Sequence, residues 1–108
     1  MITIMLALAA ASSTSYSTCT QDRTDELIAF AVAKYKKADS ALNAQWKAIS
    51  HPLQVMRAQK AWIAFRDAEC LAQNSASPDG SLFPVFKYLC LAELTETRAK
   101  QLHELAIR

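Results

Sequence analysis

Residues that break helices are nearly absent from this chain, and that scarcity constrains its fold more than any other feature. The 108 residues include one Gly and three Pro. A β protein of this length needs many tight turns, which these two residue types usually supply. Ala, Leu, Lys, Glu and Gln are common instead, and they are strong helix formers. The sequence therefore predicts a single all-α domain built from a few long helices.

The start of the chain has the pattern of an export signal. Residues 2–11 form an uncharged apolar run that is too short to span a bilayer, and small polar residues follow it. The run ends in an Ala-x-Ala pair, so we expect cleavage before Ser12. Residues 1–18 are then a signal peptide with a short polar leader, and residues 19–108 are a helical domain. The alternative is that the run is an N-terminal core helix.

Hydrophobic spacing divides the domain into three helices. The first is expected over about 24–49, and Pro52 opens a second that runs to about residue 72. A polar loop over 73–81 holds the glycine, and Ser81 is expected to cap the third helix. Short connections make consecutive helices antiparallel, so we expect an up-down-up three-helix bundle.

Apolar stripes at intervals of three and four mark the faces that should be buried. The stripe of the first helix is Leu27, Ala31, Tyr35, Ala38, Leu42, Trp46 and Ile49. The stripe of the third is Phe83, Phe86, Cys90, Leu94, Arg98, Leu102 and Leu105.

Two of the three cysteines are expected to form a disulfide. Cys70 closes the second helix and Cys90 lies two turns into the third, so the loop between them makes contact natural. Closing a loop of about twenty residues stabilises a fold by roughly 3 kcal/mol in the chain-entropy model. Cys19 is left over as a free thiol or an intermolecular bridge. The alternative, two free thiols in a cytosolic protein, requires that there is no signal peptide.

Four polar residues stand on or beside the seam where the first two helices should face each other: Asp39, Asn43, Gln59 and Arg66. Burying an Asp or an Arg alone costs several kcal/mol, so such residues must pair if they are inside. With the turn at residues 50–52, an Asp39–Arg66 ion pair beside an Asn43–Gln59 amide pair would satisfy them.

An aromatic–cation contact is expected next to these residues. If Cys70 faces Cys90, the register of the second and third helices places Trp62 opposite Arg98, where a cation–π contact can form. The polar residues have three interpretations: a buried polar network that fixes helix register, a polar binding cleft between helices, or simple exposure to solvent. The sequence leaves all three open.

Catalytic and metal sites find little support in the sequence. His51 and His103 have no nucleophile at a useful spacing. His103 lies about 20 Å along the helix from Cys90, which is too far for a shared zinc ion. One glycine cannot build a phosphate-binding loop, and a net charge of +2 is too small to favour nucleic acid. We expect a protein without catalytic activity, metal or cofactor that acts by binding.

Three segments resemble a known family. They are residues 35–43 (YKKADSALN), 58–70 (AQKAWIAFRDAEC) and 90–99 (CLAELTETRA), with a Gly-Ser pair at 80–81. The pattern is similar to that of the LprI-like N-terminal domain family, which is named for a lysozyme-inhibitor lipoprotein. The similarity covers about residues 19–105.

The resemblance implies an exported helical protein of the bacterial envelope, periplasmic or secreted, with no stable membrane insertion after cleavage. Many members carry four cysteines, but the position that should pair with Cys19 holds none here. The implied partner is a protein of the envelope, with lysozyme as a candidate and its inhibition as a candidate activity. The alternative is a non-inhibitory envelope module that recognises a protein, a peptide or a cell-wall fragment.

Overall fold

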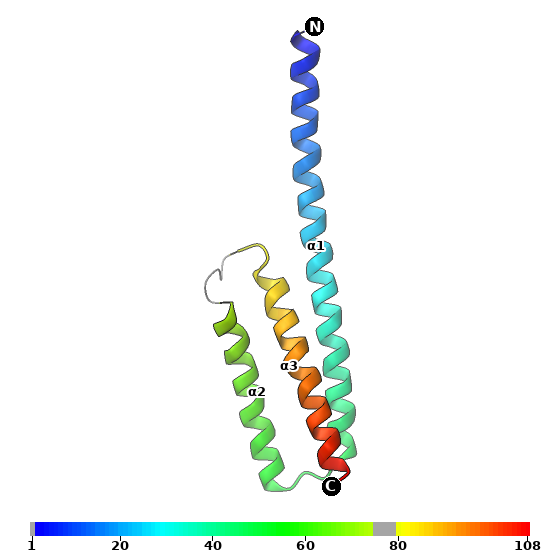
Figure 1. The fold of residues 1–108 in the computed structure, drawn as a ribbon, viewed down its shortest axis with the longest axis vertical. Helices are drawn as coiled ribbons and strands as arrows, with labels where there is room; N and C mark the ends of the chain where they lie inside the picture. Colours follow the sequence, from blue (N-terminus) through cyan, green and yellow to red (C-terminus); the bar gives the residue numbers. More distant parts are fainter. Residues whose placement is uncertain (1, 75–79) are drawn as a thin grey trace.

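The fold is entirely helical throughout the part of the chain that the structure describes. The computed structural model describes residues 2–74 and 80–108, and the side chains of residues 2–22 lie outside this description. Its elements are α1 (Ile2–Ala48), α2 (Leu53–Gln73) and α3 (Phe83–Ala106). Figure 1 shows these three helices, which confirm the predicted all-α class.

α1 begins at Ile2, well before the start near residue 24 that the sequence predicted. Residues 2–48 contain neither Gly nor Pro, so this segment has no residue that would break a helix. Two predictions fall where the structure describes no side chains: the signal peptide over residues 1–18 and the free thiol of Cys19. Both stay predictions. Among the described residues, no helix is long and apolar enough to cross a membrane.

The chain runs down α1, up α2 and down α3, so the predicted up-down-up order is confirmed (Figure 1). The order of the helices in space is different from their order in the sequence. α3 packs against both other helices, whereas no α-carbon of α1 lies within 8 Å of one of α2 in the described part of the chain. α3 is therefore the central helix, with α1 parallel to it and α2 antiparallel (Figure 1).

Small side chains dominate the interface between α1 and α3. Ala31 and Ala38 of α1 are 0% and 2% exposed, and α3 buries Ala92, Thr95 and Ala99. Because small residues let helix backbones approach closely, this pair forms the most extensive interface of the fold. Lower down, Leu42 joins a cluster with residues of α3, against which Trp46 and Ile49 pack.

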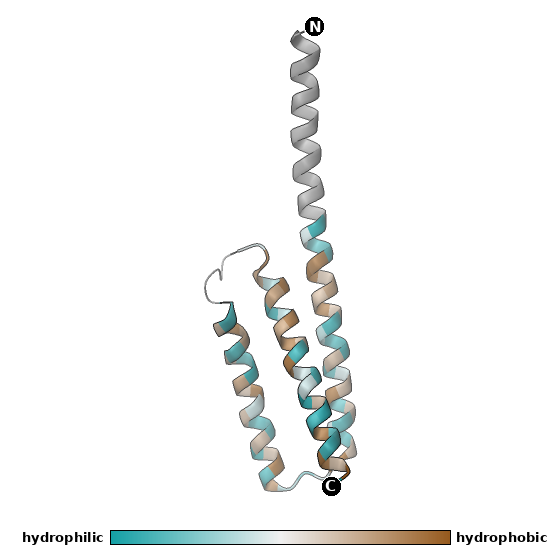
Figure 2. Ribbon diagram, viewed as in Figure 1, coloured by the Kyte–Doolittle hydropathy of each residue, from teal (hydrophilic) through white to brown (hydrophobic). Residues whose placement is uncertain are grey.

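The face that α2 turns inward is polar. Its buried residues are Gln59, Arg66 and Cys70. Its large apolar side chains are mostly exposed: Leu53, Met56, Ile63, Phe65 and Leu71. Hydrophobic and hydrophilic residues alternate along the helices (Figure 2). On α2, however, most of the large hydrophobic side chains face solvent and not the core. α2 is therefore not held by apolar burial in the way that α1 is.

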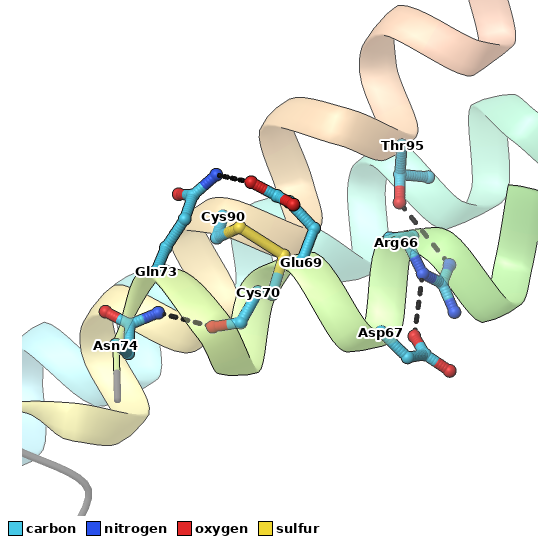
Figure 3. The surroundings of a disulfide bond; sticks show 8 residues. All are labelled: Arg66, Asp67, Glu69, Cys70, Gln73, Asn74, Cys90 and Thr95. Atoms are coloured by element: carbon cyan, nitrogen blue, oxygen red, sulfur yellow. Dashed lines mark hydrogen bonds and ion pairs between the residues drawn. A yellow bond between two sulfur atoms is a disulfide. The ribbon is translucent and has the colours of Figure 1, made fainter. Parts of the chain in front are cut away.

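The predicted disulfide between Cys70 and Cys90 is present and joins α2 to α3 (Figure 3). Cys70 is completely buried, and both cysteines belong to a core cluster with Leu91. Beyond the disulfide, the side-chain amide of Asn74 donates to the carbonyl oxygen of Cys70 at 2.7 Å and closes the end of α2. The bond thus lies at the loop end of the α2–α3 pair.

The helix ends follow the predictions at Pro52 and depart from them at Ser81. Pro52 is the N-cap of α2, and its carbonyl oxygen accepts the first helical hydrogen bond, from the backbone N–H of Met56 at 3.0 Å. The prediction that Ser81 caps α3 is wrong, because Leu82 occupies the N-cap position. The backbone N–H of Phe83 bonds to the carbonyl oxygen of Gly80 at 3.1 Å, and this turn delays the helix by one residue.

We expect Ala38→Leu to lower the free energy of unfolding by about 1–3 kcal/mol, because a larger side chain would overpack the α1–α3 interface. Ala41 is exposed on the same helix, so Ala41→Leu should change the free energy by less than about 0.5 kcal/mol. Urea unfolding followed by circular dichroism measures both. Equal midpoints for the two variants would contradict the close packing of α1 on α3.

Replacing both disulfide cysteines, as Cys70→Ser with Cys90→Ser, should lower the free energy of unfolding by about 3 kcal/mol. The bond closes a loop of 20 residues and so restricts the conformations of the unfolded chain. Without the bond the unfolded chain regains that conformational entropy, which favours unfolding. Urea unfolding of the oxidised protein and the double variant gives the difference. Hydrogen exchange should show that protection is lost first in α2; uniform loss over all helices would refute the assigned role.

Candidate functional site

A groove opens between α1 and α2, because α3 separates these two helices. It forms a cavity of about 480 Å³. α1 contributes Asp39, Leu42, Asn43 and Trp46 to its walls, and α2 contributes Met56, Gln59, Lys60, Ile63 and Arg66. The sequence analysis had selected four of these residues as a polar network or a binding cleft: Asp39, Asn43, Gln59 and Arg66. The structure brings them together in one groove.

Arg66 is the charged residue at the floor of this groove, only 9% exposed. Its Nε donates to a carboxylate oxygen of Asp67 at 3.0 Å, and its Nη1 donates to the Thr95 hydroxyl at 3.5 Å (Figure 3). Asp67 is largely exposed, with 57% of its side chain accessible. The buried guanidinium is therefore neutralised by a carboxylate that itself stays in water.

Aromatic rings stack with the two arginines in an alternating series. The guanidinium carbon of Arg66 lies 5.8 Å from the centre of the Tyr35 ring and 5.2 Å from that of Trp62. The guanidinium carbon of Arg98 lies 5.9 Å from the same Trp62 ring. The predicted cation–π contact of Trp62 with Arg98 is thus present, and the series Tyr35–Arg66–Trp62–Arg98 crosses all three helices.

Gln59 and Arg98 complete the network on the side of α3. The Nε of Arg98 donates to the side-chain oxygen of Gln59 at 2.9 Å, and its Nη1 donates to Gln101 at 3.2 Å. Gln59 is 8% exposed. Burial lowers the pKa of the Arg98 guanidinium from its usual value, but arginine remains charged at physiological pH. The bond therefore joins a buried amide to a permanent cation.

The two pairs predicted across α1 and α2 are wrong. Asp39 accepts a hydrogen bond from Asn43 on its own helix at 3.4 Å, while Arg66 pairs with Asp67 and Thr95. The physical reason is the position of α3 between the other two helices, because the cross-helix hydrogen bonds of Gln59 and Arg66 join them to Arg98 and Thr95 of α3. The Trp62–Arg98 contact predicted from the Cys70–Cys90 register occurs, whereas the pairs that assumed contact between α1 and α2 do not.

A second cavity of about 400 Å³ lies along the same helices. Arg66 lines this cavity as well as the first, and the other lining residues come from all three helices: Tyr35, Asp67, Leu71, Lys87, Tyr88 and Leu91. The sequence analysis missed Asp67 and Thr95, which hold the guanidinium of Arg66. Their signal was present, since Asp67 follows Arg66 in the segment 58–70 and Thr95 lies in the segment 90–99.

The turn between α1 and α2 has its own local contact. The ring of His51 stacks on Trp46 with centres 4.1 Å apart, and its Nε2 donates to the carbonyl oxygen of Trp46 at 2.7 Å. This bond satisfies one of the free carbonyl groups in the last turn of α1. Within the described residues, no group of three or more His, Cys, Asp and Glu side chains could hold a metal ion.

The fold and the groove define a small helical domain, linked by one disulfide, whose polar side chains surround an arginine in a concave surface. The chain matches the family described as lysozyme inhibitor LprI over residues 15–102, and it belongs to this family. Every residue of the cation–aromatic series falls within that match. The family resemblance of the three sequence segments is thereby confirmed.

The curated proteins include a relative in Rhizobium meliloti (strain 1021), described as an uncharacterized protein. It is 30% identical over 90 residues, and the coverage is 66% of this chain and 65% of the relative. The chain thus covers less than two thirds of the length of this relative. No solved structure matches the chain.

We expect Trp62→Ala to lower the free energy of unfolding by about 2 kcal/mol, because the ring is half-buried and contacts both guanidinium groups. Phe65 on the same helix is 54% exposed, so Phe65→Ala should cost less than about 1 kcal/mol. Thermal unfolding of the two variants measures the difference. A larger loss for Phe65→Ala would show that the outer face of α2 is covered in solution.

Proposed function

We propose that this protein is exported to the bacterial envelope and acts there by binding a lysozyme and inhibiting it. The observation that carries the proposal is the match to the lysozyme inhibitor family over residues 15–102. The match includes both cysteines of the disulfide and the whole groove between α1 and α2. The groove also fits a protein that acts by binding, because it is a concave surface that contains one well-ordered cation, the guanidinium of Arg66.

The disulfide supports the proposed location. Bonds of this kind form and persist in oxidising compartments such as the periplasm and the extracellular space, and they are rare in the cytosol. The Cys70–Cys90 bond is buried within a core cluster, so it is part of the folded core. The apolar run at residues 2–11, interpreted as a signal peptide, supports the same location.

One observation favours the alternative of a non-inhibitory envelope module. Lysozymes are generally basic, and an acidic inhibitor would gain encounter rate and complementarity from its charge. The net charge of this chain is +2, so attraction between net charges does not assist the encounter. Specific contacts must then supply the affinity, and the groove and the exposed apolar residues of α2 are where they can form.

The proposed activity is tested by adding the purified, oxidised protein to a lysozyme while the clearing of bacterial cell walls is recorded. We expect inhibition of at least one lysozyme type at near-equimolar ratio, and partial or full loss of it in the Cys70→Ser, Cys90→Ser double variant. Absence of inhibition at a large molar excess, against chicken-type, goose-type and invertebrate-type lysozymes, would reject the proposal and favour the non-inhibitory module.

A further inference from the structure

The guanidinium of Arg66 has donor capacity that the protein does not use. Its Nε bonds to Asp67 and its Nη1 to Thr95, and no bond of its Nη2 to another described residue is present. Each buried side-chain nitrogen or oxygen among the described residues has a hydrogen-bond partner. Nη2 therefore reaches solvent, although Arg66 as a whole is 9% exposed. A buried arginine presents an accessible edge with free N–H groups.

This cation is also held in one orientation. Tyr35 and Trp62 lie 5.8 and 5.2 Å from the guanidinium carbon, and Asp67 and Thr95 fix its Nε and Nη1. A side chain that is already ordered loses little further entropy when it binds a ligand. A planar guanidinium with two adjacent N–H donors matches the two oxygens of a carboxylate.

The charges around Arg66 favour an anion. In the groove, Arg66 and Lys60 face a single acidic residue, Asp39, whose carboxylate accepts a bond from Asn43. In the second cavity, Arg66 and Lys87 stand against Asp67. Because Arg66 is shared by the two linings, their three cations and two carboxylates together leave one net positive charge. This charge favours an incoming carboxylate over an ammonium group.

The rim of the groove is apolar. Met56 and Ile63 are 52% and 41% exposed on its α2 side, and Trp46 lies on its α1 side. A ligand that consisted only of a charged group would leave these side chains uncovered. A segment with an acidic residue between apolar neighbours could do both: its apolar residues would cover the rim while its carboxylate reaches Arg66.

We propose that the groove between α1 and α2 binds a carboxylate side chain, presented by a protruding segment of the partner protein with apolar flanks, and that Arg66 is its anchor. The inference rests on the proposed function for the identity of that partner, a lysozyme, but the carboxylate site itself does not depend on it. Because the groove is concave, the matching surface of the partner is convex.

The carboxylate site is tested with a small probe, the N-acetyl, N′-methylamide derivative of glutamic acid, added to the full-length oxidised protein. NMR spectra should show saturable shifts of the Arg66 Nε–H and Trp62 indole N–H signals. The matching glutamine derivative has the same shape without the charge and should bind at least about tenfold more weakly, since a charge-assisted bond contributes about 1.4 kcal/mol or more. Equal shifts from both probes would overturn the inference.

Variants of Arg66, at the floor, and of Ile63, at the rim, test whether the probe binds in this groove. Arg66→Met should reduce probe binding at least tenfold, whereas Arg57→Met, at an exposed arginine of the same helix, should leave it unchanged. Since Arg66 is buried, a rim variant provides a second test that spares the core. Ile63→Glu places a competing carboxylate beside Arg66 and should weaken probe binding at least tenfold more than Ile63→Gln, which removes the same apolar side chain without adding charge. Identical binding by these two rim variants would contradict the proposal.

The lysozyme assay separates this inference from the proposed function. Inhibition that Ile63→Glu weakens at least tenfold more than Ile63→Gln supports both, because the two variants remove the same apolar contact and only the first adds a negative charge. Inhibition that the two variants weaken equally overturns the anchor and leaves the function in place. Carboxylate binding by a protein that inhibits no lysozyme supports the site and rejects the proposed partner.

Discussion

The Cys70–Cys90 bond is the covalent part of the attachment of α2, which is otherwise held by hydrogen bonds to α3 and by the half-buried ring of Trp62. α1 and α3 pack through small buried residues such as Ala38 and Ala92, an apolar interface that requires no further support. α2 instead buries Gln59, Arg66 and Cys70 and leaves much of its apolar surface in water. Polar and cation–π contacts contribute modest free energies once the loss of hydration is counted. The Cys70–Cys90 bond therefore permits α2 to turn a polar face toward the rest of the protein.

That polar face is also what makes the groove a candidate site. A helix held by apolar packing would have filled the space beside α3 with hydrophobic side chains. Here the disulfide fixes the register of α2 and α3, so Trp62 lies between Arg66 and Arg98 and Gln59 bonds to Arg98. α1 closes the series with Tyr35. The buried apolar side chains thus come mainly from α1 and α3, whereas Gln59 and Arg66, the buried polar groups of the groove, come from α2.

The sequence predicted these features unequally, for physical reasons. The scarcity of helix breakers predicted the all-α class, and hydrophobic spacing with Pro52 and the polar loop predicted three helices. Two cysteines were enough to set the α2–α3 register, because a covalent bond fixes it. The stripe of α1 was largely right at Ala31, Ala38 and Leu42. On α3 the buried residues include Ala92 and Thr95, which hydropathy hardly distinguishes from surface residues. Periodicity does not state which helix is central, so the partners assigned across α1 and α2 were wrong.

Under the proposed export of this protein, the polar inner face of α2 has a consequence for the chain while it is still in the cytosol. In the reducing cytosol a disulfide does not persist, so a newly made chain would hold α2 by its weaker contacts alone. Export machinery that translocates unfolded chains would pass this domain more easily while the Cys70–Cys90 bond between α2 and α3 is absent. Under the proposed route, oxidation outside the cytosol would then both lock α2 in place and shape the groove. The protein would acquire its binding surface only in the compartment where a partner is present.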